Sequence, residues 1–411
     1  MKTALMLVTL AACGFDPPPA LIDAAVDAME VDAAEVDAAE VDAAEVDAAD
    51  APSPDAPDAA SIDAPLIDAP LIDAPLIDAP LIDAPLIDAP LIDAPSCLGQ
   101  IRCTADTAEQ CNASGQWVAL PACTNYCGVG GCISPPSCSS IGNCAGGSCC
   151  QGRYVPGGTF FRSYDGVSNL DMTHPATISP FVLERFEVSV NRFRRFVATY
   201  PGSLPAAGAG RNPHVAADPG WDASWTATMP ASKSALEAAV TACGGATYTV
   251  STGANDDLPV NCVTWYLAQA FCIWDGGRLP SEAEWNLAAA GAGEQRVYPW
   301  SSPSTSTAID ATRATYASAG PAPVGSRPAG AGRWGQLDLA GNLSEWLADW
   351  YRTPYATTGC NDCQDLTVAT ARAVRGGYYG SSSGAVTASQ RSSTAPTTAS
   401  VATGFRCIHD R

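Results

Sequence analysis

The distribution of cysteines is the feature that most restricts how this 411-residue chain can fold. Ten of its 17 cysteines lie within residues 97–150, a density too high for a domain built around a hydrophobic core. Disulfides form and persist in exported proteins, so we expect 97–150 to be a small module held together by disulfides. Zinc is the alternative for closely spaced cysteines, but this stretch contains no histidine. Sequence alone does not fix the pairing within 97–150. The segment CNASGQWVALPAC (111–123) is expected to form a short hairpin around Ser114-Gly115.

Residues 14–96 consist of short repeats that exclude a folded core. VDAAE or VDAAD occurs four times within 31–50, and LIDAP occurs six times within 66–95. A five-residue period draws no apolar stripe along a helix, and each LIDAP proline removes a helical hydrogen-bond donor. The tract holds 21 acidic residues and no lysine or arginine. We therefore expect residues 13–96 to be a disordered, extended linker.

This acidic tract accounts for almost all of the charge of the chain. The whole sequence has a formal charge of −22, and residues 97–411 are left near −2 when the tract and Lys2 are set aside. The part of the chain that can fold therefore lacks the basic surface that nucleic acids require, and we expect no nucleic-acid partner. A spacer is the simplest role for the tract; binding calcium or a basic partner is the alternative.

The N-terminus, MKTALMLVTLAAC, has the pattern of an exported lipoprotein. Lys2 supplies a positive charge, Ala4–Ala12 is apolar, and small residues precede Cys13. We predict a signal peptide over 1–12 and a lipid attached to Cys13, which would make a membrane the partner of this end of the chain. Glycine rather than aspartate follows Cys13, which favours the outer membrane or cell surface. An ordinary secretory signal with an unrelated cysteine is the alternative.

Residues 151–411 are long enough for one sizeable core, and their helix signals are few. The last of the expected helices begins with a capping box formed by Ser281 and Glu284 and ends at Gly291. The remainder reads as short strands and loops rich in Gly, Pro and Ser. We predict a mixed α+β fold with little regular structure. The expected helices are Val188–Tyr200, Thr264–Trp274 with Thr264 as N-cap, and the one that begins at Ser281.

The segment PVNCVTWYLAQAFCIWDGGRLPSEAEWNLAAAG (259–291) is a distinctive motif of this region. It resembles the signature of the formylglycine-generating enzyme, or sulfatase-modifying factor, family. The resemblance covers about 155–408 and implies a variant of the C-type lectin-like fold. The other matching segments, in family order, are VPGGTFFRS (155–163), ISPFVLERFEVSVNRFRRFV (178–197), GRWGQLDLAGNLSEWLADWY (332–351) and RAVRGGYY…GFRC (372–407).

Four residues of the signature could be mistaken for catalytic groups, namely Arg278, Glu282, Glu284 and Trp285. We interpret them as structural instead. Glu284 caps its helix, Trp285 enters the core, and Arg278 pairs with a carboxylate to brace a loop.

A calcium site is expected in the segment DLAGNLSE (338–345). Carboxylates and turning backbone within eight residues offer the hard oxygen ligands that calcium prefers. A calcium-free, hydrogen-bonded turn is the alternative. The resemblance implies as ligands the side chains of Asp338 and Glu345 and the carbonyls of Gly341 and Leu343.

The copper site of the family lacks its reactive atoms in this chain. In the family, two cysteines after a Gly-Gly pair bind copper and activate oxygen. The matching positions after Gly376-Gly377 are Ser381 and either Ala385 or Val386, and neither a hydroxyl nor an alkyl group replaces a thiolate that holds copper(I). We therefore predict no catalytic residues and no copper. The family has an aromatic residue where this chain has Ser344. A ligand groove is expected instead at Tyr378, Tyr379, Ser381 and Ser382.

Six further cysteines are spread through residues 151–411. The resemblance implies a Cys272–Cys407 disulfide. Cys360 and Cys363 are close enough to close a small loop, which leaves Cys243–Cys262. Full pairing would leave no free thiol for chemistry in this domain.

Three functions are compatible with these observations. The first is a surface-displayed, non-catalytic domain that binds a peptide or glycan. The second is an enzyme of the formylglycine-generating type, which oxidises a cysteine of a target protein, working by an altered mechanism. The third is a structural lipoprotein whose domain is a rigid head on a stalk.

Overall fold

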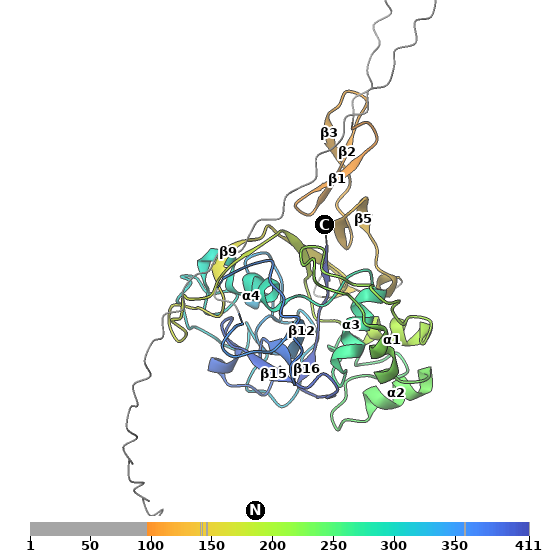
Figure 1. The fold of residues 1–411 in the computed structure, drawn as a ribbon, viewed down its shortest axis with the longest axis vertical. Helices are drawn as coiled ribbons and strands as arrows, with labels where there is room; N and C mark the ends of the chain where they lie inside the picture. Colours follow the sequence, from red (N-terminus) through yellow and green to blue (C-terminus); the bar gives the residue numbers. More distant parts are fainter. Residues whose placement is uncertain (1–96, 140, 142, 145–146, 357–358, 411) are drawn as a thin grey trace, which may run out of the picture. The chain divides into compact units, whose positions relative to one another are not determined.

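The computed structural model describes residues 97–411 except 140, 142, 145–146, 357–358 and 411 (Figure 1). The predicted signal peptide, the lipidation site Cys13 and the linker 13–96 lie outside the described residues. None of the helices in the described part is long and apolar enough to cross a membrane.

The strands of the cysteine-rich segment are all short. The first three form an antiparallel sheet, and a tight turn at Ser114-Gly115 joins the second to the third, as predicted. All ten cysteines of the segment are paired, in five disulfides. The strands are β1 (Ile101–Thr104), β2 (Thr107–Cys111), β3 (Trp117–Ala119), β4 (Tyr126–Gly128), β5 (Gly131–Ile133), β6 (Asn143–Cys144) and β7 (Gly147–Ser148).

The larger part of the chain has the predicted mixed α+β character. Short strands and long loops surround the few helices. The strands are β8 (Gly152–Val155), β9 (Gly158–Phe161), β10 (Pro175–Ile178), β11 (Phe181–Glu184), β12 (Ser344–Trp350), β13 (Cys360–Asn361), β14 (Arg372–Arg375), β15 (Ser392–Thr394), β16 (Thr403–Gly404) and β17 (Ile408–His409). The α-helices are α1 (Val190–Thr199), α2 (Lys233–Thr241), α3 (Trp265–Trp274) and α4 (Glu282–Ala290).

The three predicted helices are present, the first as Val190–Thr199 rather than Val188–Tyr200, and both predicted caps are formed. Thr264 caps α3, and the Ser281–Glu284 capping box begins α4, which ends at Gly291 in the left-handed conformation. The helix α2 was not predicted, although Ser232 caps it and its buried residues, Leu236 and Val240, have helical spacing. The helical pattern of α2 was weak in the sequence, because the helix is short and buries only two apolar residues.

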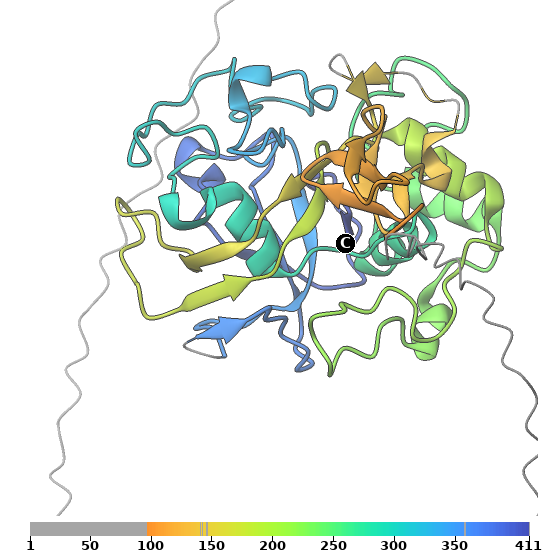
Figure 2. The same cartoon turned by 90° about the horizontal axis from the view of Figure 1, so that it is seen from above.

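The strands form small sheets rather than one large one. The largest has the order β15-β14-β12-β16, and in it β12 and β14 are antiparallel, with Trp346 opposite Val374. The others in the larger part of the chain are β13-β10-β9 and β17-β11-β8. The antiparallel pair β9–β10 lies beside α4 (Figure 2).

Three buried tryptophans connect α3, α4 and β12. Trp265 and Trp346 are buried, and each indole N–H donates to a main-chain oxygen far along the chain, Leu347 and Val263 respectively. Trp285 is fully buried and donates to Glu345. Each hydrogen bond satisfies the polar edge of a ring whose body packs in the core.

The cysteine-rich segment also contacts the larger part through buried polar groups. The Ser137 main-chain N–H and hydroxyl both donate to the Asp275 carboxylate, each at 2.8 Å. Arg192 donates to the same carboxylate at 2.6 Å and to Ser137. These groups are buried, so this contact is specific and costly to break.

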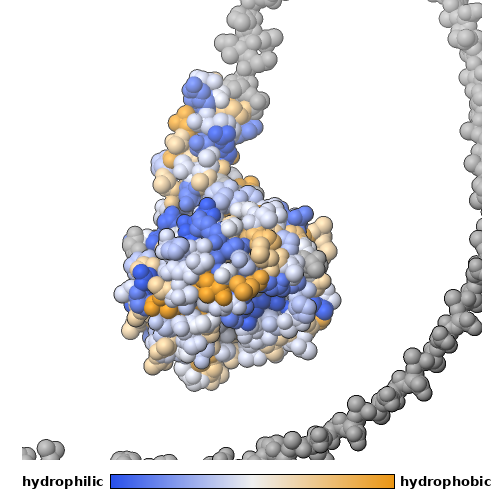
Figure 3. Space-filling model, turned by 90° about the vertical axis from the view of Figure 1, so that its left-hand side faces the viewer, coloured by the Kyte–Doolittle hydropathy of each residue, from blue (hydrophilic) through white to orange (hydrophobic). Residues whose placement is uncertain are grey.

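Apolar residues gather on part of the face that Figure 3 shows. In the described residues, the loop between β9 and β10 exposes Val167, Leu170 and Met172, with exposed fractions of 41%, 66% and 49%. This loop presents apolar surface to solvent.

Candidate functional site

The loop that matches the family's copper site lines a cavity of about 280 Å³ at the end of β14. Tyr378 and Ser381, predicted as groove residues, are in its wall, whereas Tyr379 and Ser382 are not. Ala385, one of the two positions matched to the second copper ligand, also lines it. The lining is completed by Ser344, Val374, Arg375, Gly376, Gly377, Gln390, Arg391 and Ser392.

Glycine at 377 is required for this loop to turn back on itself. Gly377 has a φ of +67°, and a Cβ there would lie 2.6 Å from the Ala385 oxygen. The turn is closed by Ser381, whose N–H donates to the Tyr378 oxygen and whose hydroxyl accepts from the Tyr378 N–H. The hydroxyl at the first copper position is thus part of the turn.

The residues present do not fit a copper ion. All sixteen cysteines of residues 97–411 are joined in disulfides, including Cys272–Cys407, Cys243–Cys262 and Cys360–Cys363. No thiolate therefore exists in the described part of the chain to hold copper(I). The histidines are no substitute, because His174, His214 and His409 do not line this cavity.

Two arginines of the cavity wall share one carboxylate, that of Glu282. Glu282 of α4 accepts from Arg375 at 3.0 Å and from both Nε and an Nη of Arg391, at 2.5 and 2.7 Å. Burial acts to raise the pKa of Glu282, but these two guanidinium groups outweigh it and lower the pKa. Among the described residues, the lining of the cavity includes both arginines and no acidic residue, so the wall is positively charged although the two cations share Glu282.

These arginines were not recognised in the sequence. The available signal was that Arg375 and Arg391 flank the loop 376–390 on both sides. Their shared partner, Glu282, lies about 90 residues before Arg375, and local spacing does not reveal such a contact. Arg375 also donates to Tyr355 and Ser163, so it ties three distant segments to the loop.

The residues predicted as calcium ligands lie in two environments. Asp338 is buried with a φ of +60°, and its carboxylate accepts from the Gly325 N–H at 2.6 Å. Glu345 is also buried, but its two oxygens accept from Arg406 and from the Trp285 indole. Gly341 must be glycine, because a Cβ there would lie 2.2 Å from the Thr315 oxygen. The carboxylate of Asp338 is available to a cation, whereas that of Glu345 is already neutralised by an arginine.

A third carboxylate, Glu187, lies against this segment. It accepts from the Leu343 N–H and from the Asn342 side chain. Burial, followed by the charges of Asp338 and Glu345, raises the pKa of Glu187 well above its usual value. Burial also raises the pKa of Asp338, to about 6. Arg406 and Arg327 act to lower the pKa of Asp338, and Arg406 acts to lower that of Glu187, but these cations do not offset the effect of burial.

The charged residues of the family signature have the structural roles that we predicted. Arg278 donates to both oxygens of Glu284, at 2.8 and 2.6 Å, and also to Asp410. Glu284 accepts from the Ser281 N–H in the capping box. Arg278 thereby ties the start of α4 to the end of the chain.

Comparison with known proteins gives the same family as the motifs. The model of the sulfatase-modifying factor enzyme 1-like domain matches residues 146–411. The formylglycine-generating enzyme of Thermomonospora curvata is 28% identical over 296 residues, which cover 62% of this chain and 92% of that enzyme. A serine/threonine-protein kinase, pkn1 of Chlamydia caviae, is 34% identical over 152 residues, which are 36% of this chain and only 24% of the kinase.

A solved structure, PvdO from Pseudomonas aeruginosa, has 19% identity and a TM-score of 0.46, and the match covers 68% of this chain and 100% of that protein. The family model accounts for well over half of the chain. The chain therefore belongs to the sulfatase-modifying factor family through its residues 146–411.

Proposed function

We propose that this protein is a non-catalytic, surface-anchored binding protein that uses the sulfatase-modifying factor fold. The observation that carries this proposal is the state of the cysteines. Ser381 and Ala385 or Val386 replace the two copper ligands, and every cysteine of residues 97–411 is in a disulfide. Copper-dependent oxidation of a target cysteine would then have no metal centre.

The cavity beside Tyr378 is the proposed ligand site. Its wall offers an aromatic ring, hydroxyls and an amide, which suit hydrogen bonding to a peptide or a glycan. The two arginines of the wall, Arg375 and Arg391, favour a ligand that carries negative charge. Ser344 lies in the wall where the family has an aromatic residue, so the smaller side chain leaves the space open.

The test is to screen the full chain against peptide and glycan arrays and then to fill the cavity. Ser344→Trp should abolish binding of any ligand that the array identifies, without lowering the melting temperature substantially. Ser382→Trp is the matched control, because Ser382 is exposed and outside the cavity wall. A ligand that binds equally well to Ser344→Trp would place recognition elsewhere. An array without any ligand would favour the structural-head alternative.

The enzyme alternative is supported by the likeness to a formylglycine-generating enzyme over 92% of that enzyme's length. It is tested by titrating the protein with copper and measuring oxygen uptake with a cysteine-containing peptide. Turnover that requires the protein would contradict the non-catalytic proposal. Thiol titration in denaturant checks the premise, and it should find no free thiol among the sixteen cysteines.

The lipid anchor is the second part of the proposal. It is supported by the apolar segment and small residues before Cys13 and by the acidic tract that follows. Cys13→Ser should move the protein from the membrane fraction to the soluble fraction. A variant that stays in the membrane fraction would show that the anchor lies elsewhere.

We also propose that calcium binds at Asp338 and the carbonyls of Gly341 and Leu343. The crowding of the buried carboxyl groups of Asp338 and Glu187, which raises both pKa values, supports this proposal, because a bound cation would favour their charged forms. Glu345, the fourth predicted ligand, is paired with Arg406 and is left out of the proposed ligand set.

A further inference from the structure

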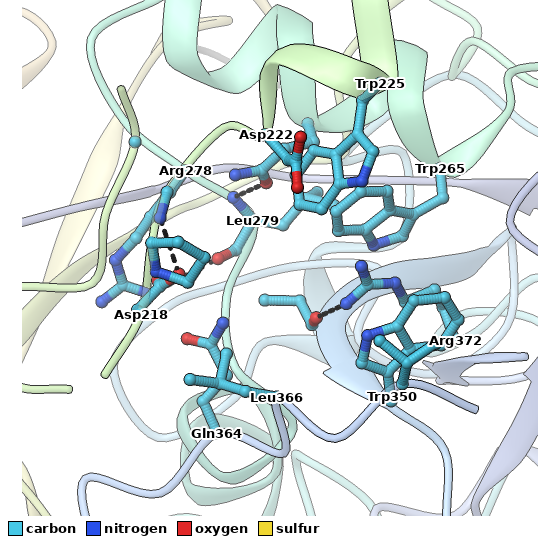
Figure 4. Close-up of a pocket in the computed structure, with 16 residues that line it drawn as sticks. Asp218, Asp222, Trp225, Trp265, Arg278, Leu279, Trp350, Gln364, Leu366 and Arg372 are labelled. Atoms are coloured by element: carbon cyan, nitrogen blue, oxygen red, sulfur yellow. Dashed lines mark hydrogen bonds between the residues drawn. The ribbon is translucent and has the colours of Figure 1, made fainter. Parts of the chain in front are cut away.

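A second cavity, separate from the proposed ligand groove, opens at the start of β14. It has a volume of about 180 Å³ and shares no lining residue with the groove. Trp225, Trp265 and Trp350 line it, together with Arg372 (Figure 4). These residues come from the loop before α2, from α3, from β12 and from β14, so the fold assembles the cavity from four distant segments.

Arg372 is a buried cation without a counterion. Its side chain is nearly inaccessible, and its guanidinium carbon lies 3.7 Å from the ring centroids of both Trp265 and Trp350. One Nη donates to the Ala348 oxygen at 2.5 Å, and Nε has no hydrogen-bond partner among the described residues. No carboxylate of the described part forms an ion pair with it, although Arg192, Arg278, Arg375 and Arg406, buried elsewhere in the domain, each have one.

The other charged groups around this cavity already have partners within the protein. Asp218 accepts from the main-chain N–H groups of Asn212 and Gly220. Arg278 is paired with Glu284, and Asp222 caps the turn that follows it. Arg372 differs from these groups, because its Nε has no hydrogen-bond partner among the described residues and its guanidinium points into the cavity (Figure 4).

The pKa of Arg372 agrees with this geometry. Burial lowers it to about 9, and the charges of Asp349, Tyr266 and Asp218, which act to raise it, do not offset that effect. A bound anion would restore the pKa, since an opposite charge in contact favours the charged form.

The walls of the cavity select the rest of the ligand. Trp225 meets Trp265 edge-on at 5.1 Å, and Leu279 and Leu366 add apolar surface. Aromatic walls often hold cations, but here Arg372 already occupies the space between Trp265 and Trp350 and would repel a second cation. The volume is below that of typical drug-sized sites, so the ligand is one small group rather than a long chain.

We infer that this cavity binds a carboxylate carried on a small aromatic or branched apolar body, with the carboxylate on Arg372 and the body against the tryptophans. A free organic acid and the C-terminal residue of a peptide share this chemistry. The site is independent of the groove beside Tyr378 and does not depend on whether that groove binds a ligand.

The first experiment uses phenylacetate and its uncharged amide, phenylacetamide, as probes of the full chain. Phenylacetate should raise the melting temperature and quench tryptophan fluorescence saturably, with an affinity at least tenfold higher than that of the amide. Equal affinities would overturn the role of Arg372, and no binding of phenylacetate up to millimolar concentrations would overturn the site. Comparing glycylphenylalanine with its C-terminal amide distinguishes the two sources: binding of the free dipeptide as well as phenylacetate supports the peptide C-terminus, and phenylacetate alone supports the free acid.

The second experiment fills the cavity without touching Arg372. Leu366→Trp should abolish phenylacetate binding, because the larger side chain takes the space of the ligand. Leu170→Trp is the matched control on an exposed loop and should bind like the wild type. Ser344→Trp, which blocks the groove, should also bind phenylacetate normally. Unchanged binding by Leu366→Trp, or its loss in Ser344→Trp, would place the ligand outside this cavity.

Discussion

Glu345 and Arg406 form a fully buried ion pair, with an Nη–Oε1 distance of 2.7 Å. Arg406 also donates to main-chain oxygens of Glu184, Arg185 and Leu337, so it joins β12 to the loops around β11. The Trp285 indole completes the contacts of Glu345. The pair therefore neutralises one of the predicted calcium ligands and holds together segments that are 60 to 220 residues apart.

Removing one partner of this pair should be strongly destabilising. Glu345→Gln removes the one carboxylate that is hydrogen-bonded to the buried Arg406 guanidinium among the described residues, and the expected loss in the free energy of unfolding is about 3–5 kcal/mol. The measurement is urea denaturation of the variant and the wild type. Arg352→Gln is the control, because the Arg352–Asp365 pair is partly exposed and should be worth less than about 1 kcal/mol. Equal losses in the two variants would contradict the role given to burial.

The features predicted from sequence were those encoded locally or by the family motifs. The Ser281–Glu284 capping box, the Thr264 cap and the turn at Ser114-Gly115 each depend on residues within a few positions. The bond between Cys272 and Cys407 was expected only through the resemblance, because spacing carries no information over 135 residues.

Features formed by long-range packing escaped the prediction. Arg372 lies in a short strand, and nothing in RAVR indicates that Trp265 and Trp350 will enclose it. Arg406 takes the carboxylate of Glu345, which the motif alone presented as a calcium ligand. In each case the arginine meets its partner because the sheet β15-β14-β12-β16 and its neighbours bring distant segments together. Tertiary contacts of this kind leave no periodic pattern in the sequence.

The Cys272–Cys407 disulfide should contribute much more stability than Cys360–Cys363. In the chain-entropy model the 135-residue separation corresponds to about 5 kcal/mol, and the three-residue separation to about 2 kcal/mol. Double alanine variants of each pair, compared by urea denaturation, give the two values. A larger loss from the Cys360–Cys363 pair would contradict this order. Peptide mapping of the unreduced wild type by mass spectrometry checks the pairing itself.

Asp349 should make the stability of the domain depend on pH. Burial, and then the charge of Glu282, raises the pKa of Asp349 to about 7 in the folded protein. In the unfolded chain the pKa is about 3.9. The contribution of Asp349 to the free energy of unfolding is therefore fully present below about pH 3.9 and is lost as the pH rises to about 7. Asp349→Asn cannot ionise, and its stability relative to the wild type should rise between pH 4 and pH 8. Asp222→Asn is the control, since that carboxylate is exposed. A constant difference across this range would mean that Asp349 ionises normally.

Calcium should stabilise the folded protein, and Asp338 should be required for the effect. Only the folded state assembles the site, so calcium at about 100 times its Kd would add roughly 2.7 kcal/mol, seen as a higher melting temperature. Asp338→Ala should remove this increment, whereas Glu237→Ala, which removes a carboxylate on α2, should keep it. Magnesium at the same concentration controls for ionic strength, because it accepts the flexible, carbonyl-rich geometry of calcium sites poorly. The acidic tract 14–96 is identical in all of these proteins, so any calcium it binds contributes equally. An equal calcium response in Asp338→Ala and the wild type would refute a site at this segment.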